Sequence, residues 1–158
     1  MATHSHATTP STAGIRLEGT TDDAALFMGQ LTALGLADKV VFTGHVSEEE
    51  KRRLMASCKV FAFPSMFESF GLAAAEAMAY GKPVVASNVG GLPEVVGDGG
   101  ILVPPASPQE LAAALDRLLK DDGLRHELGR RARDHIRPFS WDNIAAKIER
   151  IYLEEAKR

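Results

Sequence analysis

Residues 59–87 read KVFAFPSMFESFGLAAAEAMAYGKPVVAS and contain one complete strand, helix and strand pattern. An apolar run ends at Pro64, an alanine-rich segment begins near Phe70, and Gly81 closes that segment before a second apolar run. Short apolar runs bounded by proline or glycine are typical of buried strands. Strands that alternate with helices in this way favour a parallel sheet.

The rest of the chain repeats this alternation. Strands are expected at residues 15–18, 39–43, 59–64, 83–87 and 100–103. Helices are expected at residues 22–34, 48–57, 70–80, 108–120, 124–135 and 141–156, with a short helix starting at Pro93. The predicted fold class is therefore α/β, a Rossmann-like open parallel sheet with helices on both faces. Residues 1–13 are expected to form a disordered tail, and residues 14–158 a single domain.

Two helix starts carry a sequence signal for their caps. Ser47 with Glu50, and Ser107 with Glu110, have the spacing of a capping box. In this motif the serine side chain accepts a hydrogen bond from the amide three residues later. Pro108 at the first helical position supports the second start, because its fixed φ suits a helix and its missing N–H is not needed there.

Two glutamates flank the start of the helix expected at 70–80. Glu68 lies in the loop before the helix, and Glu76 lies two turns inside it among residues that are nearly all apolar. An isolated carboxylate is costly to bury unless hydrogen-bond donors meet it. A rise of about 1.5 Å per residue places the two glutamates roughly 10 Å apart, about the length of a diphosphate with a sugar at each end.

Backbone amides between these glutamates form a candidate anion site. At a helix N-terminus the amides face outward, and the partial positive charge there favours an anion. We predict a nucleotide-sugar site in which Glu68, the candidate catalytic residue, accepts hydroxyls of the transferred sugar and Glu76 accepts ribose hydroxyls. The amides expected to bind the donor sugar and phosphate are those of Ser69, Phe70, Gly71 and Leu72.

An alternative reading leaves both glutamates as surface residues. Glu76 would then lie on a solvated helix edge near Lys82, and Glu68 would be a loop residue with no role in binding a ligand. Gly90 and Gly91 present a similar choice, since they either line the site or form the turn before the short helix.

The ends of the expected strands favour a site. Open parallel sheets bind ligands beyond the carboxyl ends of their strands. Gly44, Ser65 and Asn88 follow three of the expected strands. We therefore expect these three positions to lie at the same edge of the sheet.

These segments closely resemble the group 1 retaining glycosyltransferases, which have the two-domain GT-B architecture and bind the nucleotide sugar in their second domain. The similarity runs in order from about Leu34 to Tyr152. It is carried by residues 36–44 (LADKVVFTG), 64–72 (PSMFESFGL), 81–87 (GKPVVAS), 90–96 (GGLPEVV) and 139–141 (FSW). The resemblance implies transfer of a hexosyl group from a nucleoside diphosphate sugar to a hydroxyl, with retention at the anomeric carbon and with neither a metal nor another cofactor.

The resemblance also implies a place for the nucleotide. It puts the base near Val46, with Glu48 and Lys51 at the edge of the base or at the ribose. The alternative for Glu48, Glu49 and Glu50 is that acidic residues simply suit the positive end of a helix.

Parts that the resemblance leads us to expect are not matched in this sequence. Family members carry a first strand, an arginine and a lysine that neutralise the leaving diphosphate, and a whole acceptor-binding domain upstream. We therefore expect the C-terminal half of a GT-B fold that is inactive alone. A missing strand would expose sheet edges, so we expect self-association or a separate acceptor-binding chain as partner. Trp141 is expected to pack at the start of the last helix, and Ile151, Tyr152 and Leu153 to form an exposed stripe or a dimer contact.

Other reactive side chains are expected to be structural. Cys58 is the only cysteine, so no intrachain disulfide forms, and a buried core thiol is expected. His45 has no carboxylate neighbour fixed by the sequence, and His4 with His6 supplies too few ligands for a metal. The basic cluster at residues 130–133 is expected to be a solvated helix face.

Composition narrows the class of protein. The 158 residues carry a formal net charge of −3, which offers no general attraction for nucleic acid or for a membrane surface. No apolar run approaches the roughly 20 residues of a membrane span, and the first residues lack the apolar core of a signal peptide. A cytoplasmic location is predicted.

Three functions fit this sequence. The chain is either the donor-binding half of a glycosyltransferase, or a nucleotide-sugar-binding module without turnover, or an interaction protein on the same scaffold. Retention of Glu68 and Glu76 favours the first two, because a scaffold with an empty cleft has no physical need for either carboxylate.

Overall fold

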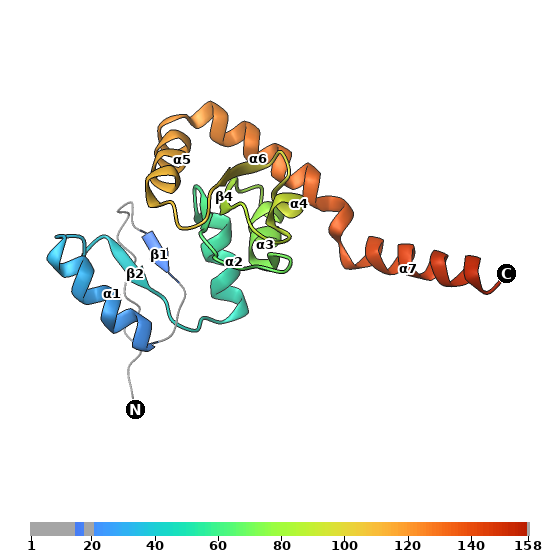
Figure 1. Cartoon of the computed structure of the whole chain (residues 1–158), viewed down its shortest axis with the longest axis horizontal. Helices are drawn as coiled ribbons and strands as arrows, with labels where there is room; N and C mark the ends of the chain where they lie inside the picture. Colours follow the sequence, from blue (N-terminus) through green and yellow to red (C-terminus); the bar gives the residue numbers. More distant parts are fainter. Residues whose placement is uncertain (1–14, 18–20, 158) are drawn as a thin grey trace. The chain divides into compact units, whose positions relative to one another are not determined.

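The computed structural model describes residues 15–17 and 21–157 (Figure 1). These residues belong to two compact units, unit 1 up to Lys51 and unit 2 from Arg52 onward. The expected tail lies outside the described residues, and the expected single domain over residues 14–158 stays a prediction.

Unit 1 is a strand, helix and strand followed by the first residues of another helix. β1 (Ile15–Leu17) pairs in parallel with β2 (Val40–Phe42), and α1 (Thr21–Ala33) connects them. The ring of Phe27 in α1 lies 6.3 Å from the ring of Phe42 in β2. The helix therefore packs on its strand pair through apolar side chains, as in other strand, helix and strand units.

Unit 2 contains a parallel sheet in the order β3, β4, β5. Its strands are β3 (Phe61–Phe63), β4 (Val84–Ser87) and β5 (Gly100–Val103). Its helices are α3 (Leu72–Ala79), α4 (Leu92–Val96), α5 (Pro108–Lys120), α6 (Asp122–Ile136) and α7 (Trp141–Glu155), with the 3-10 turn η1 (Arg137–Phe139) before α7. Every described strand pairing is parallel, which confirms the predicted sheet type.

Helices cover both faces of the unit 2 sheet, as predicted. Successive residues of a strand point to opposite faces, so Val84 and Ala86 join one buried cluster and Val85 joins another. The first cluster contains side chains of α3, α4 and the C-terminal part of α6, and the second contains side chains of α5. α6 reaches both clusters, with Ala132 in the first and Leu128 in the second.

The two expected capping boxes have different outcomes. Ser47 Oγ accepts from the Glu50 amide at 3.2 Å, which confirms the serine half of the first box at the start of α2 (Glu48–Ser57). Ser107 makes no side-chain cap bond, so the second box is wrong, although α5 begins at Pro108 as predicted. The ψ of Ser107 is 80°, whereas Ser140, whose hydroxyl does cap α7, has ψ 147°. Asp121 caps α6 from a backbone similar to that of Ser107, with ψ 96°. At such a ψ the longer aspartate side chain reaches an amide that the short serine hydroxyl does not.

Asp121 supplies a cap that the sequence analysis did not identify. Its Oδ1 accepts from the Leu124 amide at 2.8 Å, and α6 begins at Asp122, two residues before the expected start. We expect Asp121→Ala to lower the free energy of unfolding by about 1 kcal/mol, because an N-terminal amide loses its acceptor. Ser107→Ala is the matched control and should change it by less than about 0.5 kcal/mol. Equal losses in urea denaturation of the two variants would contradict this assignment.

The last helix differs from expectation at its first residue. None of the residues of α7 is buried, and Trp141 is 79% exposed, so the expected packing of Trp141 is wrong. Phe139, two residues earlier, packs on the first buried cluster instead. Ile151, Tyr152 and Leu153 are all more than half exposed in the single chain, as both expected alternatives, an exposed stripe and a dimer contact, require.

The basic cluster in α6 is a solvated face, as predicted. Arg130 pairs with Asp134 at 3.1 Å, and Arg131 pairs with Glu127, all with well-exposed side chains. Such exposed pairs one helical turn apart contribute little to stability. Within residues 15–17 and 21–157, no helix is both long and apolar enough to cross a membrane.

Candidate functional site

The loop between β3 and α3 carries the predicted site residues of unit 2. β3 ends at Phe63, and α3 begins at Leu72, not at Phe70 as expected. The residue before the helix, Gly71, has φ 98° and ψ 49°, a left-handed conformation that ends the loop and that side chains with a Cβ rarely adopt. This turn delays the helix by two residues.

Glu68 binds the amides at the end of its own loop. Its Oε1 accepts from the amide of Phe70 at 3.2 Å and from the amide of Gly71 at 3.1 Å. These are two of the amides that the sequence analysis expected to face a ligand. The expectation that these two amides are free is therefore wrong, and their role in donor binding stays a prediction.

The first turn of α3 supplies further outward-facing amides. The first regular helical bond runs from the Ala75 amide to the Gly71 carbonyl at 3.0 Å. The amides of Leu72, Ala73 and Ala74 precede this bond and so lack an acceptor within the helix. The carboxylate of Glu68 lies beside this positive end of the helix, which shows that an anion is accommodated at this position.

Glu76 lies on the half-exposed side of α3. Ala74, Ala77 and Met78 are fully buried against the sheet, whereas Leu72, one turn before Glu76 on the same line of the helix, is 57% exposed. Glu76 itself is half-buried, and it already interacts with another group of the chain. Because α3 is otherwise apolar, a glutamate at its edge is compatible with both the ligand role and the surface role.

Gly90 and Gly91 pack against the Glu68 loop. The Gly91 amide donates to the Glu68 carbonyl at 3.2 Å. A Cβ at Gly90 would overlap the Glu68 carbonyl oxygen, and a Cβ at Gly91 would overlap the Ser69 carbonyl oxygen. The glycines are therefore required because two backbone segments approach closely here, and they hold the predicted catalytic loop in place.

This contact brings together the loops that follow β3 and β4. Ser65 lies in the first loop and Asn88 in the second, so the expectation that these two positions share the carboxyl edge of the sheet is confirmed. The signal for the glycine contact was present in the sequence, as two adjacent glycines directly after a strand, but the sequence did not reveal which backbone they meet.

The residues expected near the base and ribose lie in unit 1. Val46 is half-buried in the loop after β2, and His45 beside it is exposed. Lys51 Nζ lies 3.2 Å from Glu48 Oε2, one turn apart on α2, with the lysine side chain 26% and the glutamate side chain 72% exposed. The pair is a local helix contact, and its role toward a nucleotide stays a prediction.

Cys58 does not have the properties of a nucleophile. Its thiol is half-buried and donates to the Met55 carbonyl at 3.3 Å. Burial raises the pKa of the Cys58 thiol above its ordinary value, and the positive charge of Lys82 offsets this only in part. A raised pKa leaves less thiolate at neutral pH, which fits a structural thiol.

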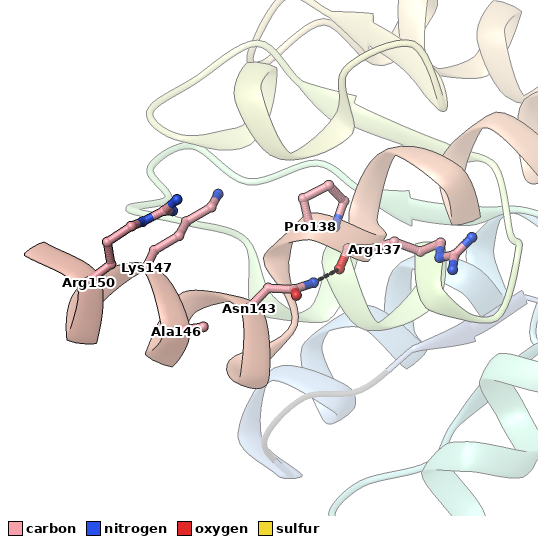
Figure 2. A pocket seen from close by; sticks show the side chains of 6 residues that line it. All are labelled: Arg137, Pro138, Asn143, Ala146, Lys147 and Arg150. Atoms are coloured by element: carbon pink, nitrogen blue, oxygen red, sulfur yellow. Dashed lines mark hydrogen bonds between the residues drawn. The ribbon is translucent and has the colours of Figure 1, made fainter.

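Two open surface hollows of unit 2 lie along α7, away from the predicted site residues. One, of about 620 Å³, lies between η1 and α7 and is lined by Arg137, Pro138, Asn143, Ala146, Lys147 and Arg150. In Figure 2, Lys147 and Arg150 extend on the same side of α7, while the guanidinium of Arg137 points away from them. Asn143 Nδ2 donates to the Arg137 carbonyl at 3.0 Å and closes the turn.

In the described part of the chain, no group of three or more His, Cys, Asp or Glu side chains could hold a metal ion.

Comparison with known proteins gives the family. The family profile described as glycosyl transferases group 1 matches residues 19–135. The D-inositol 3-phosphate glycosyltransferase of Streptomyces bingchenggensis is 43% identical over 123 residues, which are 77% of this chain and 27% of that protein. The chain spans less than a third of the length of such curated relatives.

Solved structures agree with this result. Sucrose-phosphate synthase from Thermosynechococcus elongatus superposes with a TM-score of 0.80 and 33% identity, over 90% of this chain and 38% of that one. HepE of Anabaena, solved in complex with UDP-glucose, superposes with a TM-score of 0.77 and 29% identity, over 93% of this chain and 42% of that one. The predicted resemblance to GT-B enzymes and the predicted fold class are both confirmed.

Proposed function

We propose that this chain, which belongs to the group 1 family of glycosyl transferases, is the donor-binding part of a retaining glycosyltransferase. In this proposal a hexosyl group passes from a nucleoside diphosphate sugar to a hydroxyl of an acceptor. The acceptor is bound by a second part, on the same or another polypeptide, and the 158 residues alone do not turn over. The cytoplasm is the expected site of action.

The arrangement of Glu68 is the observation that carries this proposal. Its carboxylate oxygen Oε1 accepts from the amides of Phe70 and Gly71 at 3.2 and 3.1 Å. A carboxylate fixed in this way keeps one orientation without a ligand, so little order is lost when a sugar binds. We assign the other oxygen, Oε2, to the hydroxyls of the transferred sugar.

The start of α3 is assigned to the diphosphate. The outward amides of Leu72 and Ala73, together with the positive end of the helix, suit a phosphate oxygen. When the sugar departs, negative charge grows on the diphosphate, and fixed donors at that point stabilise the charge without having to reorganise. The chain's own contribution to the chemistry is therefore electrostatic, with Glu68 positioning the sugar and the α3 amides holding the leaving group.

Glu76 is assigned to the ribose. It lies about 6 Å along the helix axis from Leu72, since each residue rises by about 1.5 Å. This separation suits a nucleotide whose phosphate lies at the helix start and whose ribose lies beside the second turn. On the strength of the family resemblance, Val46 is assigned to the base, and Glu48 and Lys51 are assigned to the edge of the base or to the ribose.

The relatives support the class of donor. HepE of Anabaena was crystallised with UDP, and also with UDP and glucose. The relatives at 43% identity include the D-inositol 3-phosphate glycosyltransferase of Streptomyces bingchenggensis and the MMP alpha-(1->4)-mannosyltransferase of Mycolicibacterium hassiacum. We therefore propose a nucleoside diphosphate hexose as donor and leave its base and sugar to experiment.

Calorimetric titration of the purified chain tests this proposal. UDP, GDP and ADP, and the glucose and mannose conjugates of each, would be titrated in turn. We expect one base to be preferred by at least about tenfold in Kd, which corresponds to about 1.4 kcal/mol. We also expect no transfer to water or to simple sugars by the chain alone. Absence of binding of all nine ligands at millimolar concentration would contradict a donor-binding role.

A further inference from the structure

Three segments that are far apart in the sequence meet at one aromatic contact. The ring of Phe70, in the loop before α3, lies 6.2 Å from the ring of Phe139 in η1, with 47° between their planes. The ring of His135, in the last turn of α6, lies 5.8 Å from Phe139, with 38° between their planes. Tilted ring pairs at this spacing attract each other beyond the effect of buried area.

His135 also holds the end of α4. Its Nε2 lies 2.9 Å from the carbonyl oxygen of Glu94, and because a carbonyl only accepts, Nε2 carries the hydrogen and donates it. The ring lies against Gly97, where a Cβ would overlap it. The corner formed by α6 and η1 therefore contacts α4 through His135 and the Glu68 loop through Phe139.

The contact of His135 with α4 and the contact of Phe139 with Phe70 both lead to the Glu68 loop. α4 follows directly after Gly91, whose amide donates to the Glu68 carbonyl. The Glu68 carboxylate in turn accepts from the amides of Phe70 and Gly71. These contacts form a closed circuit. Residues 135–139 contact α4, which follows Gly91, and they also contact the ring of Phe70, which follows Glu68 in the loop.

Phe139 is the member of this circuit that joins it to the core. It packs on the first buried cluster, whereas Phe70 is 40% exposed and belongs to the loop. Without Phe139, the Phe70 ring would lose a neighbour that is itself fixed by the core. The Phe70 amide would then be freer to leave the Glu68 carboxylate.

We propose that Phe139 is a positioning residue of the donor site, which acts by holding Phe70 so that the Phe70 and Gly71 amides keep Glu68 in place. The assignment of the donor site rests on the function proposed above. The positioning itself does not, because the bonds that Phe139 supports lie entirely within the chain.

Amide NMR of the 158-residue chain tests the positioning directly. Glu68→Gln should move the amide proton resonances of Phe70 and Gly71, because their charged acceptor becomes neutral. In a Phe139→Leu background the same replacement should move them less than half as far. The effect of Glu68→Gln is measured as a difference in amide shift within each background. The change in ring current that the loss of Phe139 itself causes therefore cancels.

Two further variants separate positioning from general loosening. Phe61→Leu removes another ring that packs on the same buried cluster, so it should leave the Glu68→Gln shifts at full size. Phe70→Leu removes the ring pair from the exposed side and should reproduce the effect of Phe139→Leu even if the latter folds poorly. Full-size shifts in both ring-deleted backgrounds, or equally reduced shifts with Phe61→Leu, would overturn the proposal.

Ligand binding provides the second arm. If the chain binds a nucleoside diphosphate sugar, Phe139→Leu should weaken it about five- to tenfold, and Phe139→Tyr should restore most of the affinity because the ring returns. Unchanged affinity with Phe139→Leu would overturn a positioning role in donor binding. If the unmodified chain binds no nucleotide while the NMR result holds, the proposed function fails and the positioning of Glu68 stands.

Discussion

Replacing Gly90 by alanine is expected to lower the free energy of unfolding of unit 2 by about 2–4 kcal/mol and to displace the Glu68 loop. The added Cβ would overlap the Glu68 carbonyl oxygen, which is backbone and cannot rotate away. Gly90 also has φ 51°, a conformation that costs an alanine about 1 kcal/mol or more. One of the two backbone segments must therefore move, and the Gly91 to Glu68 hydrogen bond is the contact that breaks.

Urea denaturation followed by circular dichroism measures the loss of stability. Gly29→Ala is the control, because Gly29 lies within α1, has no neighbour within 4 Å and does not have a positive φ. An alanine there should raise stability by about 0.5–1 kcal/mol. If Gly90→Ala were as well tolerated as Gly29→Ala, the close approach of the two loops would not exist in solution.

The fold was predictable because its elements are bounded by strong local signals. The segment from Pro64 to Gly81 carries a strand end, a helix and a stop within a few residues of their observed positions. Apolar runs at 83–87 and 100–103 have too few residues for helices and form β4 and β5. The prediction failed where it depended on which side chain packs, as at Trp141, which is exposed while the partly buried Phe139, two residues earlier, packs against the first cluster.

The candidate site was proposed from residue types, and its contacts were not predicted. The sequence drew attention to Glu68 and the amides after it, since a carboxylate before a helix start is a local pattern, and their role toward a donor stays a prediction. It did not reveal that the Glu68 carboxylate binds the amides of Phe70 and Gly71, because this contact accompanies a left-handed backbone at Gly71 that the residue types alone do not fix. It also could not reveal the contact between Phe70 and Phe139, because Phe139 lies about seventy residues away in the sequence and meets Phe70 only through the packing of α6 and η1.

The carboxylate of Glu68 at the start of α3 changes how the site should be understood. An anion site lined only by free amides would bind phosphate and leave the sugar undefined. Here two amides already hold Glu68. In the proposed donor site the sugar position would therefore be set by Glu68, and phosphate would use the next amides along the helix. The division of the amides between Glu68 and the diphosphate predicts that changes to the two glutamates affect ligands differently.

Glu76→Gln is expected to weaken the preferred nucleoside diphosphate and its sugar conjugate alike, each by about 1.5–3 kcal/mol, because a charged hydrogen bond to the ribose is lost. Glu68→Gln is expected to weaken the sugar conjugate and to leave the bare diphosphate nearly unchanged. Glutamine keeps an oxygen that can accept from Phe70 and Gly71, so the loop should persist, while the negative charge that meets the sugar hydroxyls is gone. Calorimetric Kd values for the two ligands with each variant provide the measurement.

Glu110→Gln is the control for these two replacements, because Glu110 is an exposed glutamate in the first turn of α5, outside the predicted site. It should change neither Kd by more than about twofold, since a distant surface charge is screened by salt. A loss for Glu76→Gln confined to the sugar conjugate would reverse the orientation of the donor along α3, with the ribose toward the loop. Equal binding by all three variants would remove both glutamates from the donor site, and Glu68 would then be only a helix cap.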